Sequence, residues 1–208
     1  MFQEAQIKVL KAMFPIFNIP SKKKRKSINL NMKGTGFFID DKGLFISASH
    51  IFEVNNEELT YLYKGIPSID GINLHYEIKE VFRDQRLDLF IGRIQSKTPS
   101  YLELKSDLIN SGDPVCLGGY PNPDYKVSWI NTSISSKENL TWPKMGYFFL
   151  CYGVKSVPLP RMSGGPAFTP DGSVVGMITG SLNSKKGILL NSKTIIETIG
   201  QYYKKIWS

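Results

Sequence analysis

The sequence predicts an all-β protein with two successive sets of about six short strands and a helix at the end of the chain. Two observations carry this prediction. Short apolar runs alternate with turn residues through residues 34–94 and again through 114–191, and the intervening segment, residues 97–113, is polar and rich in turn residues. The chain has 208 residues, of which 41% are hydrophobic and 21% charged. That composition is typical of a globular protein, and the length allows two halves that share a core.

Residues 1–30 are expected to form an N-terminal arm outside the strand-rich region. A short helix is predicted to end near Pro15, and the run SKKKRKS at residues 21–27 follows as a basic linker in a chain of formal net charge +8. Such a run could bind nucleic acid or another acidic surface, but a solvated linker is its more common role. Because no zinc-finger, RNA-recognition or helix-turn-helix pattern accompanies it, we do not expect nucleic acid as a partner.

The amino-terminal sequence indicates a cytoplasmic protein that does not associate with a membrane. It interleaves Glu4, Lys8 and Lys11 with apolar residues, whereas a secretory signal places its charges before an uninterrupted apolar block. No run approaches the roughly 18 apolar residues that a membrane-spanning helix requires.

The two cysteines, Cys116 and Cys151, lie in apolar, strand-like runs. A buried, reduced thiol is the usual state there, although a single disulfide between the two remains an alternative. The histidines are His50 and His75, and neither has metal-ligand spacing to a cysteine. We therefore expect no metal and no cofactor.

The first set of strands is predicted at residues 34–40, 43–49, 60–65, 74–82 and 87–94, and Asp-Asp-Lys-Gly at 40–43 is a hairpin signal. The second set is predicted at 114–121, 126–134, 146–153, 165–170, 173–181 and 187–191. The tail, residues 192–207, has apolar residues at helical spacing, and Ser192 is its expected N-cap.

Three residues are candidates for chemistry. Ser163 lies in Ser-Gly-Gly-Pro, which is also a good turn sequence in its own right. A nucleophilic serine needs a base, a group that orients the base, and donors for an oxyanion. His50 lies at a strand end, where a single histidine is more often structural than catalytic. Asp88 opens the apolar stretch Leu-Phe-Ile, so its carboxylate needs a partner such as a histidine N–H.

The segments that hold these residues are SASH at 47–50, LDLFIGRI at 87–94 and MSGGPAF at 162–168, in the order His, Asp, Ser. Order and flanking residues resemble the trypsin-like (chymotrypsin-fold) serine proteases, most closely the HtrA-type and other bacterial trypsin-like peptidases. The resemblance runs from about Gly34 to Ile199.

The resemblance implies a fold of two six-stranded antiparallel β-barrels. The first, residues 31–105, would hold His50 and Asp88, and the second, residues 106–208, would hold Ser163 and the C-terminal helix. It also implies a serine endopeptidase that acts on a protein or peptide substrate through an acyl-enzyme. Ser163 would attack the peptide carbonyl, His50 would transfer the proton, and Asp88 would orient the imidazole.

By the same resemblance, the backbone N–H groups of Arg161 and Ser163 would form the oxyanion hole. The family usually has glycine where this chain has Arg161, and arginine adopts the required backbone angles at a cost. The hole could therefore be assembled only on activation, by loop ordering or a regulatory protein partner. Alternatively, the chain is a catalytically weak pseudoprotease that serves as a peptide-binding module.

The resemblance also suggests a substrate-binding surface. Thr179, Gly180 and Ser181 would pair with the substrate backbone as an added strand. Val157 would lie at the base of the specificity pocket, with Ile178 to Ser181 and Ile188 on its walls. Because nothing acidic lies there, an apolar or small side chain is expected at the cleaved position.

Overall fold

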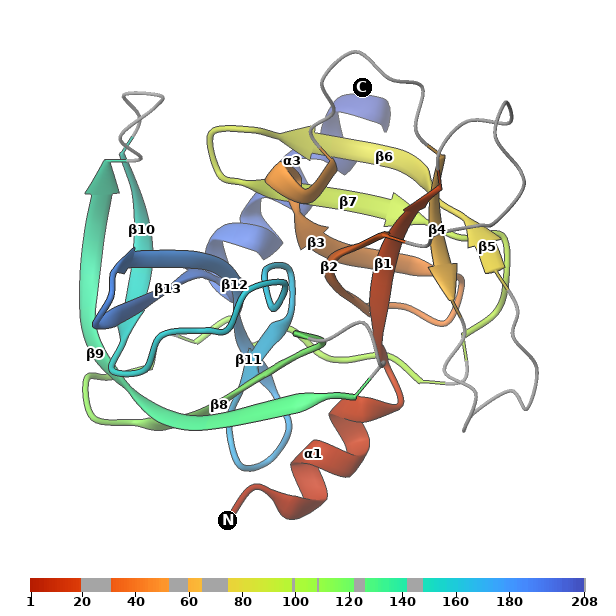
Figure 1. Ribbon diagram of the computed structural model, residues 1–208. Coiled ribbons are helices and arrows are strands. Elements are labelled where there is room, and N and C mark those ends of the chain that lie inside the picture. The colour runs from red at the N-terminus through yellow and green to blue at the C-terminus, as the bar shows by residue number, and fades with distance from the viewer. Residues whose placement is uncertain are drawn as a thin grey trace.

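In the computed structural model, the two predicted strand sets form two sheets that lie side by side (Figure 1). The structure describes residues 1–19, 31–52, 60–64, 75–98, 100–107, 109–121, 126–141 and 148–207. The basic run at 21–27 lies outside these residues. The all-β fold with a C-terminal helix is confirmed.

The first half is a seven-stranded antiparallel sheet with the order β5-β4-β1-β2-β3-β7-β6. It has one strand more than the six-stranded barrel that was expected, because part of the N-terminal arm joins it. Its strands are β1 (Met13–Ile19), β2 (Asn31–Phe38), β3 (Leu44–Ala48), β4 (Thr60–Lys64), β5 (His75–Glu77), β6 (Lys79–Asp84) and β7 (Leu89–Arg93).

The second half is a closed barrel with the order β10-β13-β12-β11-β8-β9, so its six strands agree with the expected number. The strands are β8 (Pro114–Gly119), β9 (Ser128–Thr141), β10 (Phe148–Val154), β11 (Pro166–Phe168), β12 (Val174–Asn183) and β13 (Lys186–Asn191).

Strand β1 is the main difference from the sequence prediction. Helix α1 (Gln3–Leu10) ends well before Pro15, and the apolar run that follows continues as a strand paired with β2. Strand β4 pairs with β1 only from Ile16 onward. Pro15 therefore lies where β1 has one described neighbour, and its missing N–H is tolerated there. The expected arm of residues 1–30 thus contributes a buried strand to the first sheet.

One hydrophobic cluster joins the two halves. It contains Phe14, Phe45 and Phe90 of the first sheet and also Phe168 and Met177 of the barrel. Burial of a large apolar side chain contributes about 1.5–3 kcal/mol. This shared core holds β3 against β12, beside the candidate site.

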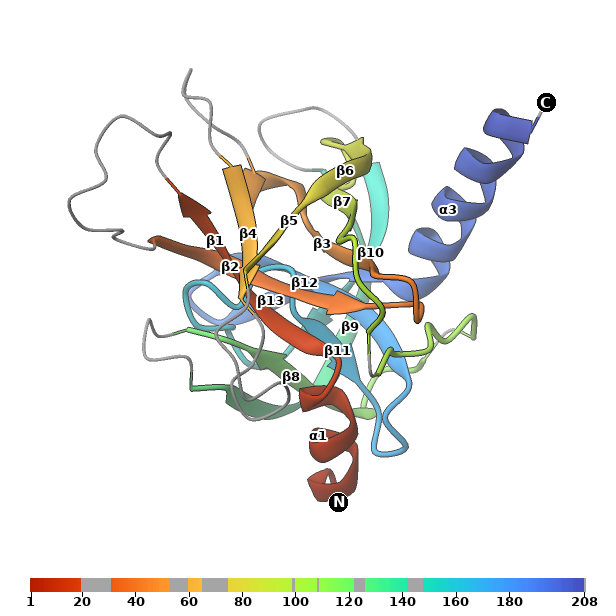
Figure 2. The same cartoon turned by 90° about the vertical axis from the view of Figure 1, so that its right-hand side faces the viewer.

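Helix α3 (Ser192–Trp207) ends the chain and projects away from the barrel (Figure 2). Its N-terminus is capped by Asn191, whose Oδ1 accepts the Thr194 N–H at 2.8 Å. The expected cap, Ser192, instead donates its hydroxyl to the carbonyl of Lys105. The Tyr202 hydroxyl donates to the Val81 carbonyl at 2.9 Å, which ties α3 to the first sheet. Within the described residues, no helix combines the length and apolar character needed to cross a membrane.

Cys116 and Cys151 are both buried thiols that form no disulfide, so the disulfide alternative is not realised. Burial raises the pKa of the Cys116 thiol, with a partial offset from a hydrogen bond donated by Gln6. Both cysteines therefore pack as small apolar side chains.

Candidate active site

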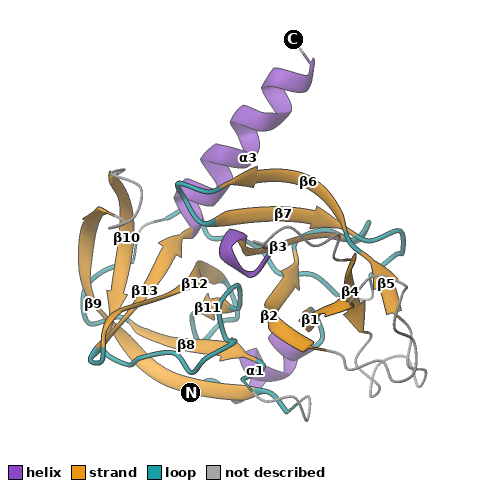
Figure 3. Cartoon of the chain, turned by 45° about the horizontal axis from the view of Figure 1, so that its top comes forward, coloured by secondary structure: helices purple, strands orange, loops and turns teal. Residues whose placement is uncertain are grey.

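His50 and Asp88 are in direct contact. Strand β3 pairs with β7 so that Ala48 lies opposite Leu89. Because the strands are antiparallel, the short helical turn after β3 (Ser49–Phe52) meets the turn before β7. His50 Nδ1 lies 2.8 Å from Asp88 Oδ2 and 3.0 Å from Oδ1. Figure 3 shows the helical turn, in purple, between the two halves.

The Asp88 carboxylate is held from several directions. Its Oδ1 also accepts the backbone N–H of His50 at 2.9 Å, and its carbonyl accepts the N–H of Ser49 at 2.9 Å. The Asp88 side chain is 8% exposed, against 39% for His50. The bonds from the His50 backbone N–H and ring to the carboxylate oxygens offset the desolvation of the carboxylate. Since Asp88 accepts from Nδ1, Nε2 is the ring nitrogen suited to receive a proton.

A second aspartate shapes the turn that carries Asp88. Asp84 Oδ1 accepts the N–H groups of Arg86 at 2.8 Å and Leu87 at 3.2 Å, and Oδ2 accepts from the Arg86 guanidinium at 2.9 Å. Burial raises the pKa of Asp84, but these hydrogen bonds outweigh it and hold the pKa below its usual value. The sequence alone did not single out Asp84, although aspartate is common in turns because its carboxylate can accept the backbone N–H two residues later.

The Ser163 turn packs against the strands that lead to His50. A Cβ on Gly164, where φ is +83°, would lie 2.2 Å from the Thr35 carbonyl oxygen and 2.3 Å from Ser47 Oγ. A Cβ on Gly165 would lie 2.1 Å from the Gly118 carbonyl oxygen. Both glycines are therefore required by close backbone approach. Ser163, half-buried, accepts the Thr35 N–H on its carbonyl at 3.0 Å.

The backbone N–H groups on either side of Ser163 have protein acceptors. The N–H of Met162 donates to Leu159, that of Gly164 to Ile178, and that of Gly165 to Met162.

In the described part of the chain, the N–H groups of Arg161 and Ser163 donate to no protein acceptor. Arg161 already has φ of +69°, the left-handed conformation that glycine would adopt easily. Two N–H groups on alternate residues are thus available to an oxyanion.

The predicted substrate-binding residues fall into two groups. Ile178 is buried, and its N–H and carbonyl bond to Gly165 and Gly164, so its backbone supports the Ser163 turn. Thr179 is also buried, and its hydroxyl donates to the Ile188 carbonyl. Gly180 is half-buried and Ser181 is exposed, so the outer part of β12 remains accessible.

Val157 is half-buried in the segment that follows β10. A Cβ on Gly187 would lie 2.6 Å from the Ser156 carbonyl oxygen and 2.7 Å from Pro158 Cδ. The segment that carries Val157 therefore runs directly beside the start of β13, which pairs with Ser181.

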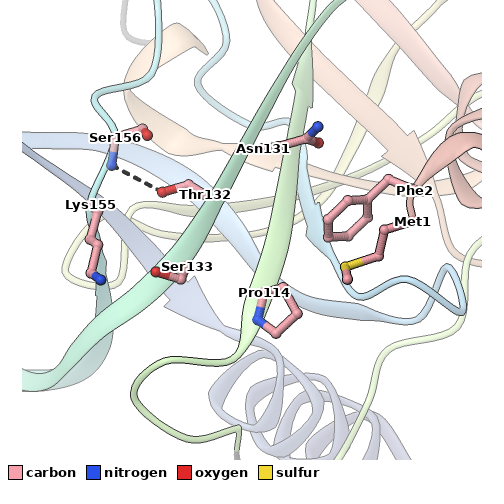
Figure 4. Close-up of a pocket in the computed structure, with 8 residues that line it drawn as sticks. All are labelled: Met1, Phe2, Pro114, Asn131, Thr132, Ser133, Lys155 and Ser156. Carbon is pink, nitrogen blue, oxygen red and sulfur yellow. Dashed lines mark hydrogen bonds between the residues drawn. The ribbon is translucent and has the colours of Figure 1, made fainter.

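The structure also contains an open pocket of about 510 Å³ (Figure 4). Its walls contain none of His50, Asp88 and Ser163. Within the described residues, no group of three or more His, Cys, Asp or Glu side chains is arranged to hold a metal ion. The pocket is lined by Met1, Phe2, Pro114, Asn131, Thr132, Ser133, Lys155 and Ser156.

Comparison with known proteins gives a family match and a curated relative. Residues 34–177 match the trypsin-like peptidase domain. A probable periplasmic serine endoprotease, DegP-like, from Chlamydia pneumoniae is 23% identical over 175 residues, which cover 83% of this chain and 34% of that protein. The chain therefore spans about a third of the length of this curated relative.

Two solved structures share the fold. The HtrA-type protease AlgW with decapeptide has a TM-score of 0.81 and 14% identity, covering 98% of this chain and 68% of that one. The Rv3671c protease from M. tuberculosis, in its active form, has a TM-score of 0.77 and 17% identity, covering 94% of this chain and 82% of that one.

Proposed function

This chain belongs to the trypsin-like peptidase family, and on that premise we propose that it is a serine endopeptidase that cleaves peptide bonds through an acyl-enzyme on Ser163. The observation that carries the proposal is the His50–Asp88 pair, at 2.8 Å, on the strand end against which the Ser163 turn packs.

In the proposed reaction, Ser163 Oγ forms a bond to the peptide carbonyl carbon while its proton passes to His50 Nε2. The tetrahedral intermediate breaks its C–N bond, and the imidazolium returns the proton to the leaving amine. Water then hydrolyses the ester by the same proton route. Asp88 keeps the imidazole in one tautomer throughout and stabilises its cation.

The oxyanion would be bound by the N–H groups of Arg161 and Ser163. Both lack a protein acceptor in the described part of the chain, and Arg161 already has the left-handed backbone. These observations favour an enzyme whose hole exists at rest over one that needs ordering by a partner. They also favour an active protease over a pseudoprotease, because the donors persist along with the three side chains.

The proposed substrate is a protein or peptide that lies along the accessible edge at Gly180 and Ser181. The backbone there would pair with an extended substrate. Val157 would face the side chain at the cleaved position, and we propose that an apolar or small side chain is preferred there. A peptide library with one varied position, read by mass spectrometry, tests this preference. Cytoplasmic localisation stays a prediction that cell fractionation tests.

Hydrolysis of casein and of a quenched-fluorescence peptide tests the activity itself. The proposal expects cleavage by the wild type and none by Ser163→Ala or His50→Ala. The double variant should be no worse than either single variant, since the groups work as a unit. Undiminished cleavage by Ser163→Ala would show that another residue is the nucleophile.

A further inference from the structure

Thr35 on β2 links the segments that surround the Ser163 turn. It is fully buried. Its hydroxyl donates to the Arg161 carbonyl at 3.2 Å and accepts the N–H of Tyr120 at 3.0 Å. Its backbone N–H donates to the Ser163 carbonyl at 3.0 Å, and its own carbonyl accepts from the Ser47 hydroxyl at 2.7 Å. Two of these bonds reach the residues whose N–H groups lack an acceptor.

Arg161 needs such support because its φ of +69° brings an L-residue's Cβ close to the following carbonyl oxygen. Two side-chain bonds hold it there. The Thr35 hydroxyl binds its carbonyl, and its own guanidinium Nη1 donates to the Pro121 carbonyl at 3.2 Å. The Thr35 hydroxyl also accepts the Tyr120 N–H, and the Arg161 guanidinium binds the neighbouring Pro121 carbonyl. Arg161 is therefore linked to the backbone at residues 120–121 in two ways, once through Thr35 and once directly.

We infer that Thr35 is a positioning residue whose hydroxyl holds the Arg161 peptide in its left-handed conformation, so that the Arg161 N–H remains available to the oxyanion. The inference rests on the proposed function. A hydroxyl can donate once and accept as well, and here it does both. Serine would keep both bonds, whereas valine has nearly the same shape and would keep neither.

The test combines Thr35→Val and Thr35→Ser with Arg161→Gly, because glycine adopts positive φ without support. With Arg161 retained, we expect Thr35→Val to lower kcat about tenfold, less than the roughly 10²- to 10³-fold lost with an oxyanion donor. KM should change less than about twofold, and Thr35→Ser should restore kcat to within about threefold. In the Arg161→Gly background the fall caused by Thr35→Val should shrink to under about threefold.

Two further readouts separate positioning from loss of stability. Thr35→Val removes the hydroxyl that accepts the buried Tyr120 N–H in either background, so Tm should fall equally in both. The acidic limb of the pH profile of kcat should be the same in Thr35→Val as in the wild type, since no described bond joins Thr35 to His50 or Asp88. An equal fall of kcat in both backgrounds would overturn the inference, because Thr35 would then not act through Arg161.

Nuclear magnetic resonance of the resting, ¹⁵N,¹³C-labelled protein tests the inference without turnover. The Arg161 amide and Cα shifts should report a left-handed residue in the wild type and Thr35→Ser, and a changed or divided population in Thr35→Val. An inactive wild type with this spectral response would sink the proposed function but not the conformational link. Unchanged Arg161 shifts in Thr35→Val would overturn the link, whatever the activity.

Discussion

At the scale of single residues, backbone strain coincides with the candidate chemistry. In the described part of the chain, the non-glycine residues with positive φ are Asp88, at +54°, and Arg161, at +69°. Aspartate tolerates this region better than most residues, and Arg161 is held by Thr35 and Pro121. Strained residues persist where surrounding bonds determine them, and they gather at functional sites.

The carboxylate of Asp88 gives the sharpest residue-scale prediction. Asp88→Asn should lower kcat by roughly 10⁴-fold, because an amide no longer fixes the imidazole tautomer. Peptide hydrolysis measures kcat, and circular dichroism checks that the fold persists. Asp171→Asn is the matched control, since Asp171 is exposed and bonds within its own turn, to Thr169 and Ser173. A loss of under tenfold in Asp88→Asn would contradict the assigned role.

Gly164 allows a prediction about close approach. Gly164→Ala would place a Cβ 2.2 Å from the Thr35 carbonyl oxygen, and we expect a loss of about 2–4 kcal/mol in unfolding free energy, along with most activity. Gly112→Ala has similar backbone strain, at φ +94°, but meets nothing within 4 Å. It should lose only about 1 kcal/mol. Urea denaturation measures the unfolding free energy of both variants. Equal losses of stability would show that positive φ alone, and not the close approach, requires glycine at residue 164.

At the scale of elements, the turn between β6 and β7 carries Asp88 and is fastened by Asp84. The Asp84 carboxylate holds two backbone N–H groups of that turn and the Arg86 guanidinium. Its pKa is lowered in the folded protein. The unfolded chain therefore binds the proton more tightly, and the stabilisation is full above about pH 4 and lost as pH falls through the folded pKa.

Comparison of the wild type with Asp84→Asn tests this turn. At pH 7 we expect the wild type to be more stable by about 1–2 kcal/mol, and the difference should shrink as pH falls below about 4. Urea denaturation at a series of pH values measures it. A difference that stays constant from pH 7 to pH 3 would show that the charge of Asp84 does not hold the turn.

At the scale of the whole molecule, the sequence predicted the two strand sets, the terminal helix and the residues worth examining. The sequence suggested a contact between Asp88 and His50, because a buried carboxylate needs a partner. The structure contains this contact, between His50 Nδ1 and Asp88 Oδ2. Strand β1 was missed because a short apolar run containing Pro15 gives no clear period. Thr35 was missed because its side-chain partners, Tyr120 and Arg161, lie 85 and 126 residues away in sequence. The left-handed backbone of Arg161 has no signal in residue type, since it depends on those distant bonds.

In the proposed function, Ser163 is a nucleophile activated by His50 and Asp88 across the two halves of the molecule. Reaction with a fluorophosphonate probe, followed by mass spectrometry of the digested protein, tests it most directly. We expect one adduct per chain, located on Ser163, with none in Ser163→Ala and labelling slowed by orders of magnitude in His50→Ala. Labelling of the wild type at another residue, or equal labelling of Ser163→Ala, would contradict it.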